Sequence, residues 1–244
     1  MDPIAEFKKE CKDRIASYPS DKPLQASGKS FLSETLRTKY SYNFTWMGRP
    51  IIQYPQDMVA MQEIIWNVKP DCIIEIGIAH GGSLIFSASM LELLGNNGHV
   101  IGVDVDIRKH NRTEIEKHPM FKRITMIEGS SVDDVIANKV RTLANKYKTI
   151  LLSLDSDHTH AHVLRELQLY APLVSVNSYC VVFDGIIEDM PDGFYADRRW
   201  GPGNNPKTAV WEYLKSNDSF VVDAEIEAKL VVTAAPSGYL KRIK

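Results

Sequence analysis

A regular alternation of short apolar runs and helical segments, beginning near residue 57, constrains the fold of this chain more than any other feature. Five of the runs are rich in β-branched residues and have the length of strands buried on both faces. They span residues 72–78, 99–106, 124–130, 149–156 and 178–186. Strands that alternate with helices imply right-handed crossovers, and therefore an α/β fold with a mostly parallel sheet and helices on both faces.

The two ends of the chain depart from this alternation. Residues 220–226 and 229–243 are predicted to form a C-terminal antiparallel hairpin. Five parallel strands followed by such a pair give the seven-stranded, Rossmann-like layout of the class I methyltransferase sheet. Residues 1–55 are expected to form a helical and loop cap on a main domain of residues 56–244. The irregular stretch 186–204, rich in Gly, Pro and Asp, is expected to be an ordered lid.

Two helix starts can also be predicted. Ser131 can cap a helix over residues 132–144, whose apolar residues recur on one stripe. Asn205 and Pro206 are typical of the N-cap and first position of a helix over residues 207–217.

Composition and charge exclude several classes of protein. With 29 Lys and Arg against 31 Asp and Glu, the chain has no basic field, and we expect no nucleic-acid partner. Its three cysteines share no metal-type spacing, which suits a reducing cytoplasm. The N-terminus lacks the apolar region of a signal peptide, and no stretch approaches the ~20 apolar residues of a membrane span. We therefore expect a cytoplasmic protein without an integral membrane segment.

The candidate site lies where the predicted strands end, because ligands of open parallel sheets bind outside the carboxyl ends of the strands. Glycines after the first strand let a ligand approach the backbone, and the next helix offers free N–H groups to an anion. The second strand ends in an acid placed to accept hydrogen bonds from a ribose diol. The residues concerned are Glu75, Gly77, Ala79, Gly81, Ser83 and Asp104.

These residues suit either a nicotinamide dinucleotide or S-adenosylmethionine. The dinucleotide fingerprint is imperfect, since Ala79 occupies its second glycine position. An acid two residues before the first glycine, here Glu75, is typical of S-adenosylmethionine sites and favours that cofactor. Gly81 and Gly82 are also compatible with helix–strand packing alone. After the third strand, a hydroxyl of Ser130 or Ser131 is placed to reach the cofactor, although Ser131 equally suits a cap.

A second group of polar residues follows strands four and five. Asp155 and Asp184 end these strands, and neighbouring strands lie ~4.8 Å apart, so the two carboxylates are expected to share a hard cation such as Mg²⁺ or Ca²⁺. Asp155 is also expected to border the cofactor. His158 lies beside them, and a neutral imidazole is the natural general base for an alcohol proton. Asp157, His160 and His162 are interpreted as structural.

Four segments together resemble one known family. They are EIGIAHGGSL, GVDVDIR, LDSDHTHAHVL with the SYCVVFD that follows it, and WGPGNNPKTAVWEYL. The chain resembles the cephalosporin hydroxylase / rhamnosyl O-methyltransferase family from about residue 45 to 235. The resemblance implies the class I methyltransferase fold, binding of S-adenosylmethionine, Mg²⁺-dependent sugar O-methylation among relatives, and homo-oligomers.

The resemblance also assigns residues. It implies Glu75, Gly77, Asp104 and Ser130 or Ser131 around the cofactor, Asp155 and Asp184 at the metal, and His158 as the base. The chain departs from the family at Phe183, where metal-dependent relatives often carry an acid. Either Glu188 or Asp189 replaces that ligand, or metal binding is weaker or absent.

We therefore expect an S-adenosylmethionine-dependent, Mg²⁺-assisted O-methyltransferase of a sugar hydroxyl. The acceptor is expected to be a small-molecule or lipid-linked sugar of a cell-surface polysaccharide such as lipopolysaccharide, a glycolipid, or a natural product. In the lid, Tyr195 and Trp200 are placed to stack on a sugar, and Arg198 and Arg199 to grip an acidic group. Two alternatives stay open: a catalytically idle S-adenosylmethionine-binding protein, and a non-haem Fe(II) hydroxylase using His158, His160 and Asp155.

Overall fold

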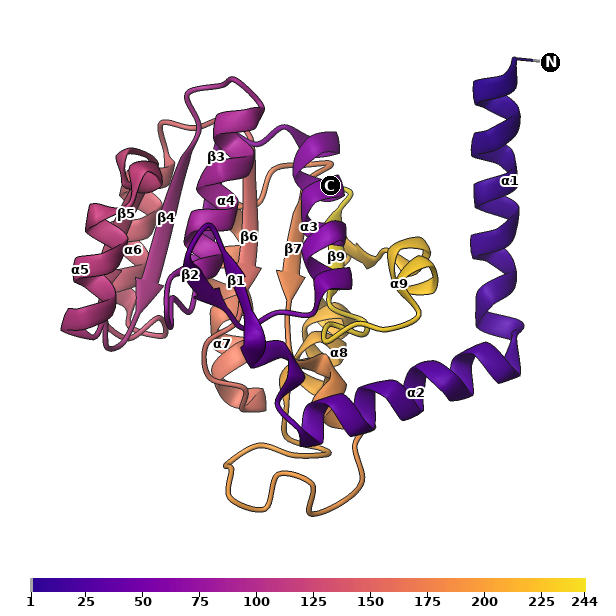
Figure 1. Cartoon of the computed structure of the whole chain (residues 1–244). Coiled ribbons are helices and arrows are strands. Elements are labelled where there is room, and N and C mark those ends of the chain that lie inside the picture. The colour runs from indigo at the N-terminus through magenta and orange to yellow at the C-terminus, as the bar shows by residue number, and fades with distance from the viewer. Residues whose placement is uncertain (1) are drawn as a thin grey trace.

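Seven strands form the central sheet in the computed structural model, which describes residues 2–244 (Figure 1). The strands are β3 (Cys72–Ile76), β4 (His99–Asp104), β5 (Ile124–Glu128), β6 (Ile150–Leu154), β7 (Tyr179–Val182), β8 (Phe220–Val222) and β9 (Tyr239–Arg242). Their order is β5-β4-β3-β6-β7-β9-β8. The strands β3 to β7 are parallel, whereas β9 pairs antiparallel with both β7 and β8. The predicted α/β fold and sheet layout are confirmed.

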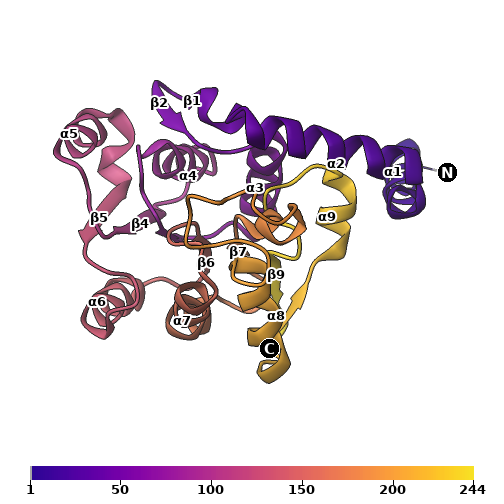
Figure 2. The same ribbon diagram turned by 90° about the horizontal axis from the view of Figure 1, so that it is seen from below.

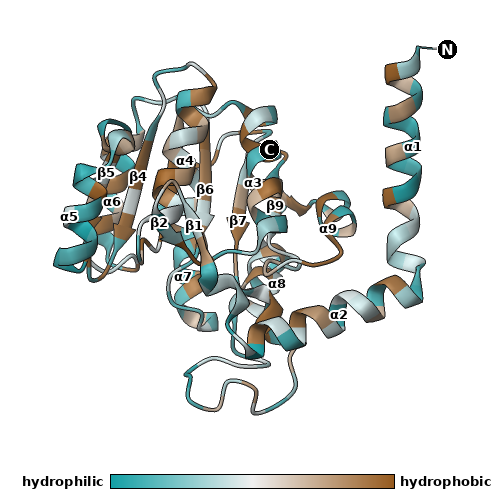
Figure 3. Cartoon of the chain, in the orientation of Figure 1, coloured by the Kyte–Doolittle hydropathy of each residue, from teal (hydrophilic) through white to brown (hydrophobic). Residues whose placement is uncertain are grey.

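The strand sequences explain why the sheet is buried on both faces. In β3, Cys72, Ile74 and Ile76 pack into one core cluster, while Ile73 packs into the other. This alternation follows from the two-residue period of a strand. The central strands are accordingly mostly apolar, as Figure 3 shows for β4 and β7.

Helices cover both faces of the sheet (Figure 2). One layer contains α3 (Pro55–Val68), α4 (Gly82–Leu93) and α5 (Lys109–Lys117), and the other contains α6 (Asp134–Ala144), α7 (His160–Tyr170) and α8 (Pro206–Ser216). Short 3₁₀ turns η3 (Pro119–Arg123), η4 (Ala171–Leu173) and η5 (Gly185–Asp189) join these elements. Within the described residues, no helix is long and apolar enough to cross a membrane.

The N-terminal residues lie outside the sheet. They form α1 (Pro3–Ser17), η1 (Tyr18–Ser20), α2 (Lys22–Arg37), η2 (Tyr40–Asn43) and a hairpin of β1 (Phe44–Trp46) and β2 (Arg49–Ile51). The hairpin packs on α4, where the rings of Trp46 and Phe86 lie 4.9 Å apart. Figure 1 shows α1 standing away from the sheet. The boundary at residue 55 between cap and main domain stays a prediction.

Helix starts were predicted with mixed success. Asn205 caps α8 with Pro206 at its first position, as expected, and Asn205 and Thr208 form a capping box. The prediction that Ser131 caps α6 is wrong. Asp133 caps that helix, and the hydroxyl of Ser131 donates to Glu166 instead.

The C-terminal hairpin is antiparallel, as predicted, but its strands are shorter. The first strand ends at Val222 because the carboxylate of Asp223 accepts the N–H groups of Glu225 and Ile226, which starts α9 (Ala224–Leu230). The second strand contains only Tyr239–Arg242.

Candidate active site

The carboxyl ends of β3, β6 and β7 lie close together because the parallel pairing continues just past the strands. The N–H of Asp155 donates to the carbonyl of Ile76 at 2.8 Å, and that of Phe183 to Leu154 at 3.0 Å. A Cβ atom on Gly77, which has φ of +102°, would lie 2.0 Å from the carbonyl oxygen of Asp155. Only glycine fits there, and it lets the two loops meet.

Glu75 is the buried acid of the predicted cofactor site. Its side chain is 3% exposed and accepts hydrogen bonds from the hydroxyls of Ser83 and, at 3.3 Å, Ser87. Burial raises the pKa of Glu75 to about 7, against the opposing effect of these two hydrogen bonds. Glu75, Gly77, Ser83 and Asp155 line one pocket with apolar neighbours that include Met58 and Phe183.

Asp104 holds the glycine-rich turn. Its Oδ2 accepts the N–H groups of Ile78 at 2.8 Å and Ala79 at 3.1 Å, and its Oδ1 accepts that of Asp106 at 3.0 Å. Ala79 has φ of +45°, and Asn111 donates to its carbonyl at 3.0 Å. The predicted ribose contact of Asp104 stays a prediction, whereas its contact with this turn is direct.

Gly81 and Gly82 are explained by packing within the chain. A Cβ atom on Gly81 would lie 2.4 Å from the side chain of Ile115, and one on Gly82 would lie 2.1 Å from the carbonyl oxygen of Pro50. The packing interpretation of these two glycines therefore has a physical basis, and a cofactor contact with them stays a prediction.

Ser130 and Ser131 follow β5 at the same edge of the sheet. Ser130 is half-buried, while Ser131 is 6% exposed. The hydroxyl of Ser131 lies 2.5 Å from a carboxylate oxygen of Glu166 and 3.0 Å from Nε2 of His162. The hydroxyl of Ser131 therefore already has two hydrogen-bond partners within the protein.

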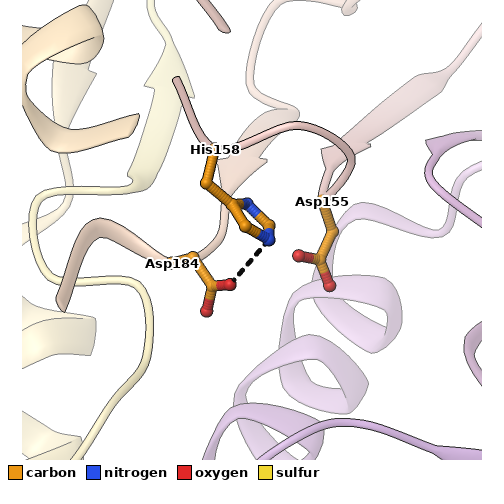
Figure 4. Close-up of side chains that lie close together, drawn as sticks. All are labelled: Asp155, His158 and Asp184. Carbon is orange, nitrogen blue, oxygen red and sulfur yellow. Dashed lines mark ion pairs between the residues drawn. The ribbon is translucent and has the colours of Figure 1, made fainter. Parts of the chain in front are cut away.

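Asp155, His158 and Asp184 form a compact cluster (Figure 4). One potential ligand atom from each lies within 4.8 Å of the others, and His158 Nε2 is 3.0 Å from Asp184 Oδ2. Burial, then the charge of Asp184, then that of Glu75 raise the pKa of Asp155 well above its usual value. A divalent cation would relieve this accumulation of negative charge, and two carboxylates with an imidazole are suitable donors for one.

Gln53 is a site residue that sequence reasoning missed. Its side-chain amide donates to Asp155 Oδ2 at 2.9 Å, and it lines the same pocket as Glu75. It lies in the turn between β2 and α3, where no periodicity or motif marks it.

Glu188 and Asp189 do not join the cluster. Glu188 accepts hydrogen bonds from the N–H of Gly203 at 2.7 Å and from the side chain of Asn205, and Asp189 pairs with Lys207 at 2.8 Å. Across residues 2–244, the cluster contains only Asp155, His158 and Asp184. These contacts turn Glu188 and Asp189 toward the start of α8 and explain why neither replaces the acid missing at Phe183.

His160 and His162, in the first turn of α7, have structural partners, as expected. The ring of His160 bonds to Thr208 at 2.8 Å and to Glu212 at 3.0 Å, both on α8. His162 bonds to Glu166 at 3.1 Å, and this hydrogen bond raises the pKa of His162. Because His160 is held against α8, the His158, His160 and Asp155 set of a non-haem Fe(II) centre is not assembled.

The stretch predicted to be a lid contacts the His158 loop and the first residue of α7. The rings of Trp200 and His158 lie edge to face with centroids 4.8 Å apart. Arg199 pairs with Asp157 at 2.5 Å, and the side-chain oxygen of Asn204 accepts the N–H of His160 at 3.0 Å. The lid is thus ordered by contacts with the loop that carries His158.

Sheet order and the two helical layers define the class of protein: the chain has the class I S-adenosylmethionine-dependent methyltransferase fold. The apo-structure of CmcI is similar with a TM-score of 0.60 and 19% identity, over 83% of this chain and 77% of that chain. The structure of CmcI with Mg and S-adenosylmethionine is similar with a TM-score of 0.57 and 19% identity, over 83% of this chain and 78% of that chain. The apo TDP-rhamnose 3′-O-methyltransferase of calicheamicin biosynthesis is similar with a TM-score of 0.53 and 14% identity, over 97% of this chain and 94% of that chain.

Sequence similarity identifies the family. Residues 38–243 match the Rhamnosyl O-methyltransferase/CmcI family. The rhamnosyl O-methyltransferase of Mycobacterium tuberculosis is 34% identical over 230 residues, which are 92% of this chain and 86% of that protein. That of Mycobacterium leprae is 32% identical over 200 residues, 81% and 82% of the two chains. The chain belongs to this family and is an O-methyltransferase, which confirms the predicted family and enzyme class.

Proposed function

We propose that this enzyme transfers the methyl group of S-adenosylmethionine to a hydroxyl of a rhamnosyl or related sugar, assisted by a divalent cation. The observation that carries the proposal is the adjacency of two groups of residues. The Asp155, His158 and Asp184 cluster shares Asp155 with the pocket of Glu75, Gly77 and Ser83. A proton acceptor thus lies next to the pocket proposed for the methyl donor.

The cofactor residues of the proposal are those that border this pocket and its rim. Glu75 would face the charged amino-acid end of S-adenosylmethionine. Gln53 lines the same pocket and donates a hydrogen bond to Asp155. Asp104 would meet the ribose at the end of β4, and Ser130 the adenine side after β5. S-adenosylmethionine supplies the methyl group already activated as a sulfonium, so the protein gains mostly by aligning the acceptor with it.

The metal would be held by Asp155 and Asp184. Mg²⁺ bound there would supply positive charge that lowers the pKa of a sugar hydroxyl. The two carboxylates fit such an ion, because an oxygen of Asp155 and an oxygen of Asp184 lie within 4.8 Å of each other and no positively charged side chain is among the groups that shift the pKa of Asp155.

His158 is proposed as the general base. It would take the hydroxyl proton on Nδ1, because Nε2 lies 3.0 Å from Asp184 Oδ2 and donates its hydrogen to that carboxylate, which would also stabilise the imidazolium that results. Trp200 packs against the ring and limits its rotation. A sugar ring that stacked on Trp200 would meet the guanidinium of Arg198, which lies over the Trp200 ring 5.4 Å from its centroid.

The acceptor is proposed from the relatives' names and from the lid. Relatives at 34% and 32% identity are named rhamnosyl O-methyltransferases. A small-molecule or lipid-linked sugar acceptor, including one from polysaccharide or lipopolysaccharide synthesis, is consistent with an exposed lid that carries Arg198 and Trp200.

Isothermal titration with S-adenosylmethionine tests the proposal, with Mg²⁺ present and after chelation. Cofactor binding that survives chelation, with a separate Mg²⁺ site lost in Asp155→Ala, supports the transferase and justifies an acceptor screen that starts with TDP-rhamnose. Absence of cofactor binding under every condition contradicts the proposal. Cofactor binding with no product from any sugar would contradict the sugar acceptor of the proposal.

Three further expectations belong to the proposal. A cytoplasmic location is consistent with three free cysteines. A cap of residues 1–55 on a methyltransferase domain of residues 56–244 is consistent with a central sheet confined to residues 72–242. Association of copies through α1 is supported by its exposed Ile4 and Phe7, 66% and 63% accessible. Light scattering of the full chain and of a Phe7→Glu variant tests the last expectation.

A further inference from the structure

Glu166 is a fully buried acid that the proposed reaction does not use. It lies on α7, beneath the two loops that follow β5 and β6, and its side chain is 0% exposed. Burial of a carboxylate is costly unless its oxygens are hydrogen-bonded, so the partners of Glu166 show what the burial achieves.

A single oxygen of Glu166 joins three segments. Its Oε1 accepts the hydroxyl of Ser131 at 2.5 Å and that of Ser156 at 2.5 Å, and lies 3.1 Å from His162 Nε2. The other oxygen, Oε2, has no hydrogen-bond partner among residues 2–244. All the polar contacts therefore converge on one atom.

The two serines sit next to the residues that matter for the proposed function. Ser131 follows Ser130 at the end of the β5 loop, and its own carbonyl accepts the hydroxyl of Tyr170 at 2.6 Å. Ser156 follows Asp155 in the loop that carries His158. This loop runs from the end of β6 to the start of α7 at His160 and contains no helix or strand. Displacement of either serine would move a neighbouring site residue.

We infer that Glu166 is a positioning residue that sets the cofactor loop after β5 and the metal loop after β6 relative to each other through one shared oxygen. The inference rests on the proposed function, since it assigns these two loops to cofactor and metal. It explains why an acid and not an apolar side chain fills this space, because an apolar residue offers no acceptor to two hydroxyls at once.

Two substitutions of Glu166 separate positioning from simple stability. Glu166→Gln keeps a carbonyl oxygen as acceptor, whereas Glu166→Leu removes it. Calorimetry measures the affinities for S-adenosylmethionine and for Mn²⁺, so neither readout needs an acceptor sugar. We expect Glu166→Leu to weaken both by about 10- to 100-fold, the usual effect of losing an orienting partner, and Glu166→Gln to restore most of both.

Asp71 offers a matched control at the other end of the strands, where β3 and β6 begin. Its carboxylate accepts the N–H groups of Lys148 at 3.1 Å and Thr149 at 2.8 Å and so joins the starts of β3 and β6. Asp71→Leu is expected to lower the Tm without changing either affinity. If Glu166→Leu lowers the Tm in the same way and leaves both affinities within about threefold, the inference is overturned.

Single-serine variants keep the test decisive if Glu166→Leu does not fold. Ser131→Ala is expected to weaken mainly S-adenosylmethionine binding, and Ser156→Ala mainly Mn²⁺ binding, because each removes one hydroxyl. Unchanged affinities in both variants also overturn the inference. If the unsubstituted protein fails to bind S-adenosylmethionine, the proposed function itself is wrong and the inference falls with it.

Discussion

Glu75 combines deep burial with a position in the pocket proposed for a cationic ligand. Because burial raises its pKa to about 7, a large fraction of Glu75 is neutral near neutral pH. The ammonium and sulfonium groups of S-adenosylmethionine favour the ionised form. We expect the affinity for S-adenosylmethionine to fall as the pH drops below 7, by up to about tenfold per pH unit. Titration between pH 5.5 and 8.5 measures this.

A Glu75→Gln variant provides the control for that prediction. It keeps the size of the side chain but cannot ionise, so its affinity should be weaker and nearly independent of pH. If its affinity keeps the same pH slope as the unsubstituted protein, another group controls binding.

His158 is the residue whose loss should affect the chemical step most. General bases contribute about 10²- to 10⁴-fold, so His158→Ala should lower kcat by that amount and leave S-adenosylmethionine affinity nearly unchanged. His160→Ala is the matched control, since its ring bonds to Thr208 and Glu212 on α8. Steady-state rates with an accepted sugar measure both. Full activity in His158→Ala would exclude it as the base, whereas a loss of Mg²⁺ affinity would identify it as a ligand.

At the scale of elements, the lid contacts the segment of His158 and His160 through one aromatic contact, one ion pair and one hydrogen bond. Arg199 is 78% exposed, so its pair with Asp157 contributes little to stability. Trp200 is the stronger contact. If a sugar stacks on it, Trp200→Ala should raise the KM for the acceptor by roughly threefold to tenfold, without changing cofactor affinity.

Trp211 on α8 serves as the control for Trp200. It is 44% exposed and is not among the residues that line the proposed cofactor pocket. Trp211→Ala should leave the acceptor KM unchanged. Equal effects of the two substitutions, or an effect of Trp200→Ala on cofactor binding alone, would argue against stacking.

The parts of the fold that could be predicted are those set by local sequence. The apolar runs 72–78 and 149–156 mark buried strands, and parallel strands bring their ends to one edge, so Glu75 and Asp155 could be expected to meet. Contacts made by distant segments could not be predicted. Gln53 reaches Asp155 across 102 positions in sequence, and it does so only because the β1–β2 hairpin packs on α4.

Other errors arose where two local signals competed. Residues 220–226 are apolar enough for a strand, but Asp223 offers its carboxylate to the next N–H groups and a helix follows. Ser131 suits a helix cap, yet its hydroxyl bonds to the buried Glu166, a tertiary partner that no local pattern reveals. Capping residues thus predict a helix start only when no stronger buried acceptor is near.

At the scale of the whole molecule, Asp57 joins α3 to the C-terminal segment. Its fully buried carboxylate accepts hydrogen bonds from Thr233 Oγ1 at 2.5 Å, the N–H of Ala234 at 2.8 Å and the hydroxyl of Tyr239 at 2.7 Å. Burial raises the pKa of Asp57 to about 6, because these three donors offset only part of the desolvation cost.

This raised pKa makes the stability of the fold depend on pH. Between the usual pKa of 3.8 and about 6, the folded protein binds the proton of Asp57 more tightly than the unfolded chain does. The stabilisation is therefore fully present below pH 3.8 and is lost as the pH rises through 6, by about 3 kcal/mol. Asp57→Asn cannot titrate, so the Tm of the unsubstituted protein minus that of Asp57→Asn should fall between pH 4 and 7. Thermal unfolding over that range measures the difference. A constant difference would mean that Asp57 keeps the same pKa in both states and that the three donors fully offset its burial.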